Sequence, residues 1–133
     1  MSKNFNILAI DPGRSKWGEA VVSESKEVLH QGIYPLQVLY PTVENLVKEF
    51  QIKCIALGNQ TGSALFETQL EPLGVLIYLV DERYSSLEAR KLFFLSHPPV
   101  GWRRFIPMTM LTPERDYDDY SAILLAKRFL AKS

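Results

Sequence analysis

The chain has 133 residues, 47% of them hydrophobic, with 15 Lys/Arg balanced by 15 Asp/Glu. This composition is globular and the length suits one core, so we expect a single domain over residues 1–133. Zero net charge argues against a protein that coats nucleic acid by charge alone. No apolar run is long enough to cross a bilayer, and the one near the N-terminus is too short for a secretion signal. We therefore expect a cytoplasmic protein with no membrane partner.

The single cysteine and the two histidines do not form a metal-binding pattern. Cys54 lies within the apolar run "IKCIALG", so we expect a small buried residue. His30 and His97 have no ligand spacing to Cys54 or to each other. We expect both histidines in loops or at the surface.

The first quarter of the chain predicts three antiparallel strands. An apolar run ends at Asp11, and Pro12 and Gly13 then predict a turn. Two further strands follow, joined by the polar residues "ESK". We expect these strands at residues 5–11, 17–23 and 27–34.

Helices and strands alternate in the rest of the chain. Apolar residues recur at helical spacing from Val38 to Phe50, and Ser85 with Glu88 forms a capping box at the start of a later helix. Two strands, each reached through a helix, predict parallel pairing by right-handed crossovers. We expect helices within 38–50, 59–73, 85–95 and 117–131, strands at 54–58 and 74–80, and a proline-rich loop at 96–115.

This order predicts an α/β fold of the ribonuclease H-like kind. The expected sheet is mixed and five-stranded, with three antiparallel strands followed by two parallel ones and helices on both faces. The first strand would lie in the centre. Ligand chemistry in such sheets collects at the carboxyl ends of the parallel strands.

Acidic residues stand at that edge in three separate elements. Asp11 ends the first strand, Asp81 and Glu82 end the last strand, and Asp118 and Asp119 open the final helix. Clustered carboxylates repel one another unless a cation neutralises them, and hard oxygen ligands suit Mg²⁺ or Mn²⁺. Two such ions can activate water in phosphodiester hydrolysis. The pattern predicts a metal-dependent hydrolase acting on nucleic acid.

Three segments resemble the YqgF/RuvX family, the RuvC-like branch of the ribonuclease H superfamily, in its cyanobacterial form. They are "ILAIDPGRSKWGEAVV", "VDERYSSLEARKLF" and "YDDYSAILLAKRFL". The resemblance covers nearly the whole chain. It implies an endonuclease that trims the 5′ end of precursor 16S ribosomal RNA, or alternatively a Holliday-junction resolvase.

The resemblance also implies the site residues. The catalytic and metal-binding acids would be Asp11, Glu82 and Asp118, and their neighbours Asp81 and Asp119 could join them. RuvC-type resolvases have an acid at the end of the fourth strand, where this chain has Asn59. Each acid also has a structural interpretation: a turn former at Asp11, a surface ion pair at Glu82 and a helix-start acid at Asp118.

Basic residues flank the acids and could bind phosphate. Trp102 stands next to a pair of arginines, a combination suited to stacking and backbone contact on single-stranded nucleic acid. The alternatives are hairpin solvation at residues 14 and 16, and a core or oligomer contact at residues 102–104. The candidates for nucleic-acid binding are Arg14, Lys16, Arg83, Arg103 and Arg104.

Two other functions compete with the nuclease. A non-catalytic nucleic-acid-binding module would keep the fold without the acids, whereas this chain has all three. An actin-like ATPase or sugar kinase would need two such domains, and the sequence contains no P-loop.

Overall fold

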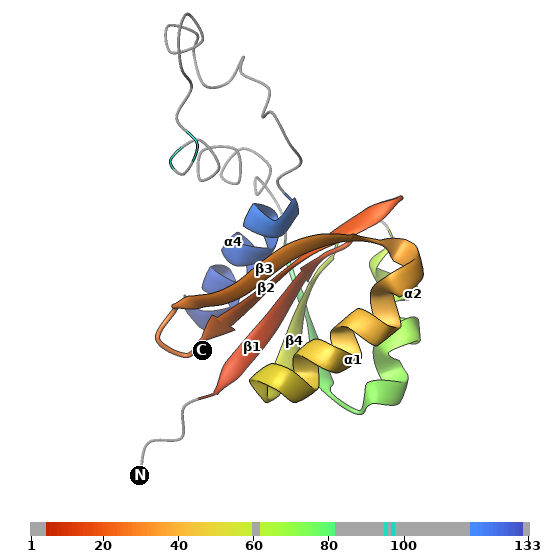
Figure 1. Ribbon diagram of the computed structural model, residues 1–133, viewed down its shortest axis with the longest axis horizontal. Helices are drawn as coiled ribbons and strands as arrows, with labels where there is room; N and C mark the ends of the chain where they lie inside the picture. The colour runs from red at the N-terminus through yellow and green to blue at the C-terminus, as the bar shows by residue number, and fades with distance from the viewer. Residues whose placement is uncertain (1–4, 60–61, 82–94, 96, 98–117, 132–133) are drawn as a thin grey trace, which may run out of the picture.

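The computed structural model describes residues 5–59, 62–81, 95, 97 and 118–131. Five strands form one sheet with helices on both of its faces (Figure 1). The predicted helix at 85–95 and the loop at 96–115 lie outside this part of the chain, except for single residues. The elements are β1 (Asn6–Asp11), β2 (Lys16–Ser23), β3 (Val28–Pro35), α1 (Leu39–Phe50), β4 (Ile52–Gly58), α2 (Ser63–Leu70), β5 (Leu76–Val80) and α4 (Asp118–Ala131), with short 3₁₀ turns at Leu36–Val38 and Glu71–Leu73.

The sheet has the strand order β3-β2-β1-β4-β5, with β1 in the centre. β1 pairs with β2 antiparallel and with β4 parallel, so that Ile10 stands between Glu19 and Leu57. β2 pairs with β3 antiparallel, and β4 pairs with β5 parallel. The predicted meander, the two parallel strands and the central position of the first strand are all confirmed.

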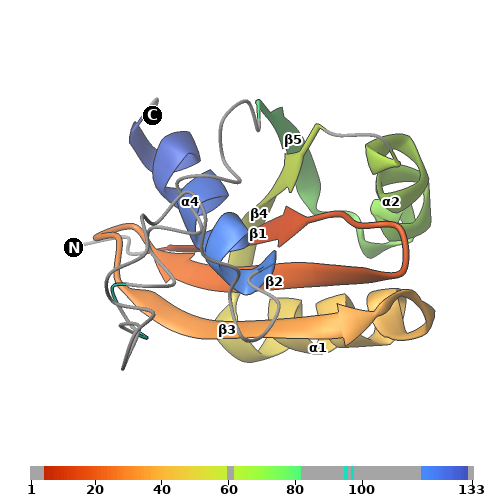
Figure 2. The same ribbon diagram turned by 90° about the horizontal axis from the view of Figure 1, so that it is seen from above.

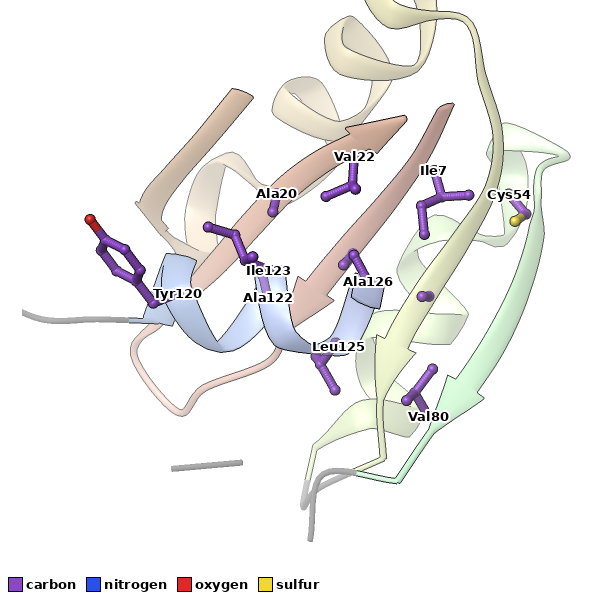
Figure 3. Packing of buried hydrophobic residues seen from close by; sticks show 12 residues of the cluster. Ile7, Ala20, Val22, Cys54, Val80, Tyr120, Ala122, Ile123, Leu125 and Ala126 are labelled. Carbon is purple, nitrogen blue, oxygen red and sulfur yellow. The ribbon is translucent and has the colours of Figure 1, made fainter. Parts of the chain in front are cut away.

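Strand alternation divides the core into two layers. Ile7 and Ala9 of β1 pack with α4, whereas Leu8 and Ile10 pack on the opposite face with α1 and α2. Figure 3 shows α4 lying across β2 and β1, with Val80 of β5 in the same layer. Figure 2 shows α4 and α1 on opposite sides of the sheet.

Local sequence signals account for the ends of these elements. Pro41 lies in the first turn of α1, and Gln51 ends that helix in the left-handed conformation, with φ of 52°. Gly74 ends the second 3₁₀ turn at φ of 72°, a conformation that glycine adopts at no steric cost. Cys54 is buried in β4 as predicted. Among the described helices, none is both long and apolar enough to span a bilayer.

Candidate active site at the carboxyl edge of the sheet

Asp11 is the last residue of the central strand, and its side chain is half-buried. Ile7 and Ala9 pack in the core layer beneath α4, and side chains alternate along a strand. Asp11 therefore belongs to the face that α4 covers. Its neighbour across the antiparallel ladder is Gly18, which has no side chain to crowd the carboxylate.

The turn from β1 to β2 carries two of the predicted phosphate-binding residues. Its path requires Gly13, because a Cβ there would stand 2.3 Å from the carbonyl oxygen of Lys16. Arg14 is exposed in the turn, and Lys16 is half-buried at the start of β2. The backbone thus places both bases at the same edge of the sheet as Asp11.

The ends of β4 and β5 lie at this edge too, since both strands run parallel to β1. The N–H of Asn59 donates to the carbonyl oxygen of Val80 at 3.0 Å, so the two strands end at the same level. Asp81 follows and is exposed. Its carbonyl oxygen accepts a hydrogen bond from Nη1 of Arg128, in the last turn of α4, at 3.1 Å. A guanidinium group therefore stands at the end of β5.

Two acids open α4, and the second of them is hydrogen-bonded to the sheet. Asp118 is the first residue of the helix, and Asp119 has a buried side chain. Both oxygens of Asp119 accept hydrogen bonds: Oδ2 from Nε2 of Gln31 at 2.8 Å, and Oδ1 from the N–H of Tyr120 at 3.0 Å. Gln31 belongs to β3, two strands away from β1. Asp119 thus links the start of α4 to the outer strand β3 through a hydrogen bond.

The metal-binding set extends beyond the described residues. Within them, no group of three or more His, Cys, Asp or Glu side chains could hold a metal ion. The side chains of Glu82, Arg83, Arg103, Arg104 and Asp118 lie outside the part of the chain whose side chains are described. The convergence of the three acids stays a prediction, and α4, which begins at Asp118, packs against β1, which ends at Asp11.

A second carboxyl group, which the sequence analysis did not select, lies on the opposite face. Glu19 of β2 has no exposed surface, and its neighbours on that face, Trp17 and Val21, pack in the layer of α1 and α2. Its Oε2 accepts a hydrogen bond from the hydroxyl of Tyr34 at 2.9 Å and lies 2.7 Å from Nδ1 of His30. Its Oε1 is buried, and none of the residues that the structure describes forms a hydrogen bond with it.

Gly32 makes this arrangement possible. It stands opposite Glu19 in the β2–β3 ladder. A Cβ at Gly32 would stand 2.5 Å from the hydroxyl oxygen of Tyr34 and 3.1 Å from Oε2 of Glu19. The missing side chain leaves room for the tyrosine to fold back over its own strand. His30, expected at the surface or in a loop, is a residue of the outer strand β3 whose side chain is 38% exposed and also contacts a buried acid.

The surroundings of Glu19 shift two pKa values. Burial raises the pKa of the Glu19 carboxyl, while the hydrogen bond from Tyr34 and the interactions with His30 oppose the rise. The Asp119 carboxylate adds to the rise. Burial, followed by the charge and hydrogen bond of Glu19, raises the pKa of the Tyr34 hydroxyl.

One local signal could have identified this network. The acid interrupts the otherwise uncharged run "WGEAVV", and His30, Gly32 and Tyr34 follow at alternate positions of the next strand. Alternation puts those three on one face of β3, and the register places Glu19 among them. No such signal exists for Arg128, whose contact with Asp81 depends on how α4 crosses the sheet.

No protein-family model and no curated protein matches the chain. Among solved structures, RuvC of Thermus thermophilus is similar with a TM-score of 0.54 and 13% identity, over 92% of this chain and 90% of that one. A Ppx/GppA family member of Aquifex aeolicus has a TM-score of 0.43 and 10% identity, over 71% and 41% of the two chains. A ROK family transcriptional regulator, a homolog of the E. coli MLC protein, has 0.46 and 16%, over 67% and 31%.

The likeness to RuvC extends over nearly the full length of both chains, and at this identity it concerns the fold. Together with the observed strand order, it establishes a ribonuclease H-like fold of the RuvC type.

Proposed function

We propose that this protein is a divalent-metal-dependent nuclease of the YqgF/RuvX type, acting in the cytoplasm on structured RNA. Processing of the 5′ end of precursor 16S ribosomal RNA is the substrate we favour, and cleavage of a Holliday junction is the alternative. The RuvC-like fold supports the nuclease class. The choice of ribosomal RNA rests on the resemblance of the three sequence segments.

The observation that carries the proposal is the position of Asp11. It ends the central strand on the face that α4 covers, and α4 begins with Asp118. A strand buried on both faces is a rigid support, which a catalytic carboxylate requires. The turn that follows supplies Arg14 and Lys16, which we expect to hold the phosphate backbone of the substrate.

Carboxylate oxygens fit Mg²⁺ or Mn²⁺, and we assign the ion to Asp11, Glu82 and Asp118. When bound, it would activate water and stabilise the leaving oxygen. We choose Asp118 over its neighbour because Asp119 is buried and already hydrogen-bonded to β3. Glu82 is favoured over Asp81 because the family resemblance assigns the metal-binding acid of the "DER" segment to Glu82.

The test is a cleavage assay on two substrates, a precursor 16S RNA 5′ segment and a four-way DNA junction, each with Mg²⁺, Mn²⁺ or EDTA. The matched variants are Asp11→Asn and Glu24→Gln. Glu24 is an exposed acid in the β2–β3 turn, so its variant controls for loss of one negative charge.

We expect metal-dependent cleavage by the parent protein and by Glu24→Gln, but not by Asp11→Asn. Cleavage of the junction alone would replace RNA by branched DNA as the substrate. If no substrate is cut, and metal does not raise the melting temperature, the nuclease proposal is wrong. Binding of RNA under those conditions would favour the non-catalytic module.

A further inference from the structure

The outer strand β5 is an apolar edge. Within the described residues its strand partner is β4, and its sequence "LIYLV" contains no charged residue. Leu76, Tyr78 and Leu79 are exposed by 65%, 46% and 54%. An edge of this kind offers backbone N–H and C=O groups to another strand, and proteins usually protect such edges with charges.

A groove runs between α2 and the beginning of this strand. It has a volume of about 400 Å³, and its apolar wall includes Val75, Leu76 and Ile77. Its other wall is one face of α2 and the following turn, where Glu67 and Glu71 stand one helical turn apart. Both glutamates are exposed, so the groove has one apolar wall and one acidic wall.

The charge of this flank differs from that of the chain as a whole. Residues 54–81 include three acids, Glu67, Glu71 and Asp81, and no Lys, Arg or His, although acids and bases balance over the whole sequence. At the groove, Glu67 and Glu71 repel phosphate groups. Arg14 and Lys16, the described bases of the proposed substrate site, lie elsewhere, at the connection from β1 to β2.

We propose that the β5 edge and the α2 groove bind an extended basic–apolar segment of a partner protein. The segment adds to β5 as a sixth strand, with its backbone hydrogen-bonded to the strand edge. One apolar side chain packs on Val75 and Ile77, and Lys or Arg side chains two positions away, on the same face of the added strand, pair with Glu67 and Glu71. Charge complementarity selects a basic peptide over a nucleic acid.

The test starts from a random ten-residue peptide library selected on the full-length protein. Peptides that bind are then measured against Glu67→Lys/Glu71→Lys and against the control Glu24→Lys/Glu27→Lys, which reverses two exposed acids at the β2–β3 hairpin. Circular dichroism verifies that both variants are folded. Amide hydrogen exchange reports whether bound peptide protects residues 76–80.

We expect the selected peptides to carry Lys or Arg two positions from an apolar residue, so that both side chains lie on the same face of the added strand. Their affinity should fall about tenfold or more in the groove variant, because reversed charges repel a basic ligand, and stay within about twofold in the control. Bound peptide should slow exchange along β5.

Equal binding to both variants, no slowing of exchange in β5, or a library that yields no binder would overturn the proposal. Two further outcomes would replace the occupant. Self-association that the groove variant abolishes would identify a second copy of the chain. Displacement of the bound peptide by a short RNA would identify nucleic acid.

Discussion

Asp11 and Glu19 lie on adjacent strands, and on the two opposite faces of the sheet. Asp11 ends β1 on the α4 side and is half-buried. Its partner in the β1–β2 ladder is Gly18, the residue before Glu19. Glu19 is fully enclosed on the α1 side, where Tyr34 of β3 donates a hydrogen bond to it and Nδ1 of His30 lies 2.7 Å from its Oε2. In the local sequence the two acids look alike, because each is a single acid next to apolar residues.

The difference shows how a carboxyl group acquires its role. An acid at the end of a strand remains close to solvent and can meet a substrate, whereas an acid in the middle of a strand must find partners inside the protein. Asp119 resembles Glu19 in this respect, since it is buried and hydrogen-bonded to β3. We therefore expect Asp11 to determine activity, and Glu19 to determine stability and its dependence on pH.

The largest expected effect is on cleavage. Asp11→Asn should reduce the single-turnover rate by about a hundredfold or more, because in the function proposed above the Asp11 carboxylate would hold the metal next to the attacked phosphate. Glu19→Gln should cut at a rate within about threefold of the parent at temperatures where it is folded, because Glu19 lies on the other face. Equal losses in the two variants would contradict the division between the faces.

For stability the order should be reversed, with the larger effect at Glu19 and the smaller one at Asp11. Glu19→Ala leaves a cavity and removes the acceptor from the Tyr34 hydroxyl, so it should lower the free energy of unfolding by about 2–4 kcal/mol. Asp11→Asn should change it by less than about 1 kcal/mol, since its side chain is at a strand end. Urea denaturation at pH 7 measures both. A Glu19→Ala protein as stable as the parent would mean that the network adds nothing to the fold.

Gly32 offers a test of the same network without changing an ionisable group. In Gly32→Ala the new methyl group would displace the ring of Tyr34 and lengthen its hydrogen bond to Glu19, at a cost of about 1–2 kcal/mol in unfolding free energy. In a protein that already carries Tyr34→Phe, Gly32→Ala should lower the unfolding free energy by less, because the hydroxyl closest to the new methyl group is absent. Additive effects in the double variant would show that the two sites are independent.

The smallest effect is the pH dependence of stability. Burial raises the pKa of Glu19 above its ordinary value of 4.5. The folded protein therefore retains this proton more strongly than the unfolded chain does. The resulting stabilisation is complete below about pH 4.5 and is lost as the pH rises through the folded pKa. His30, Tyr34 and Asp119 are the titratable groups that act on it.

Glu19→Gln removes that titration. The unfolding free energy of the parent minus that of Glu19→Gln should therefore decrease from pH 4 to pH 8, by less than the loss expected for Glu19→Ala. Asp11→Asn serves as the control. Because it keeps Glu19, its unfolding free energy minus that of Glu19→Gln should decrease over the same pH range. A difference that rises with pH would show that the ionised form of Glu19 is the one the fold stabilises.

The predicted fold agreed with the structure where the signals are local. Apolar runs broken by "DPG", "ESK" and the glycine after "EPL" predicted β1, β2, β3 and β5, and helical spacing predicted α1 and α4. Strand order followed from the connections, since crossovers through helices predict parallel neighbours. The predicted role of Asp11 rests on its place after an apolar run, on the acids of two other elements and on the family resemblance, and it stays a prediction. Glu82 and the basic pair at 103–104 stay predictions from sequence.

The sequence by itself determined the order of the described elements, the helices on both faces of the sheet and the position of Asp11 at the end of the central strand. Only the tertiary structure decided which acid partners which strand. Helical periodicity treats Asp118 and Asp119 alike, and only the packed structure reveals the hydrogen bond from Gln31 to Asp119. Likewise, the β2–β3 register brings Glu19 to His30 and Tyr34, and the crossing of α4 brings Arg128 to Asp81. Periodicity is a property of neighbouring residues, whereas register and helix crossing depend on the packing of whole elements.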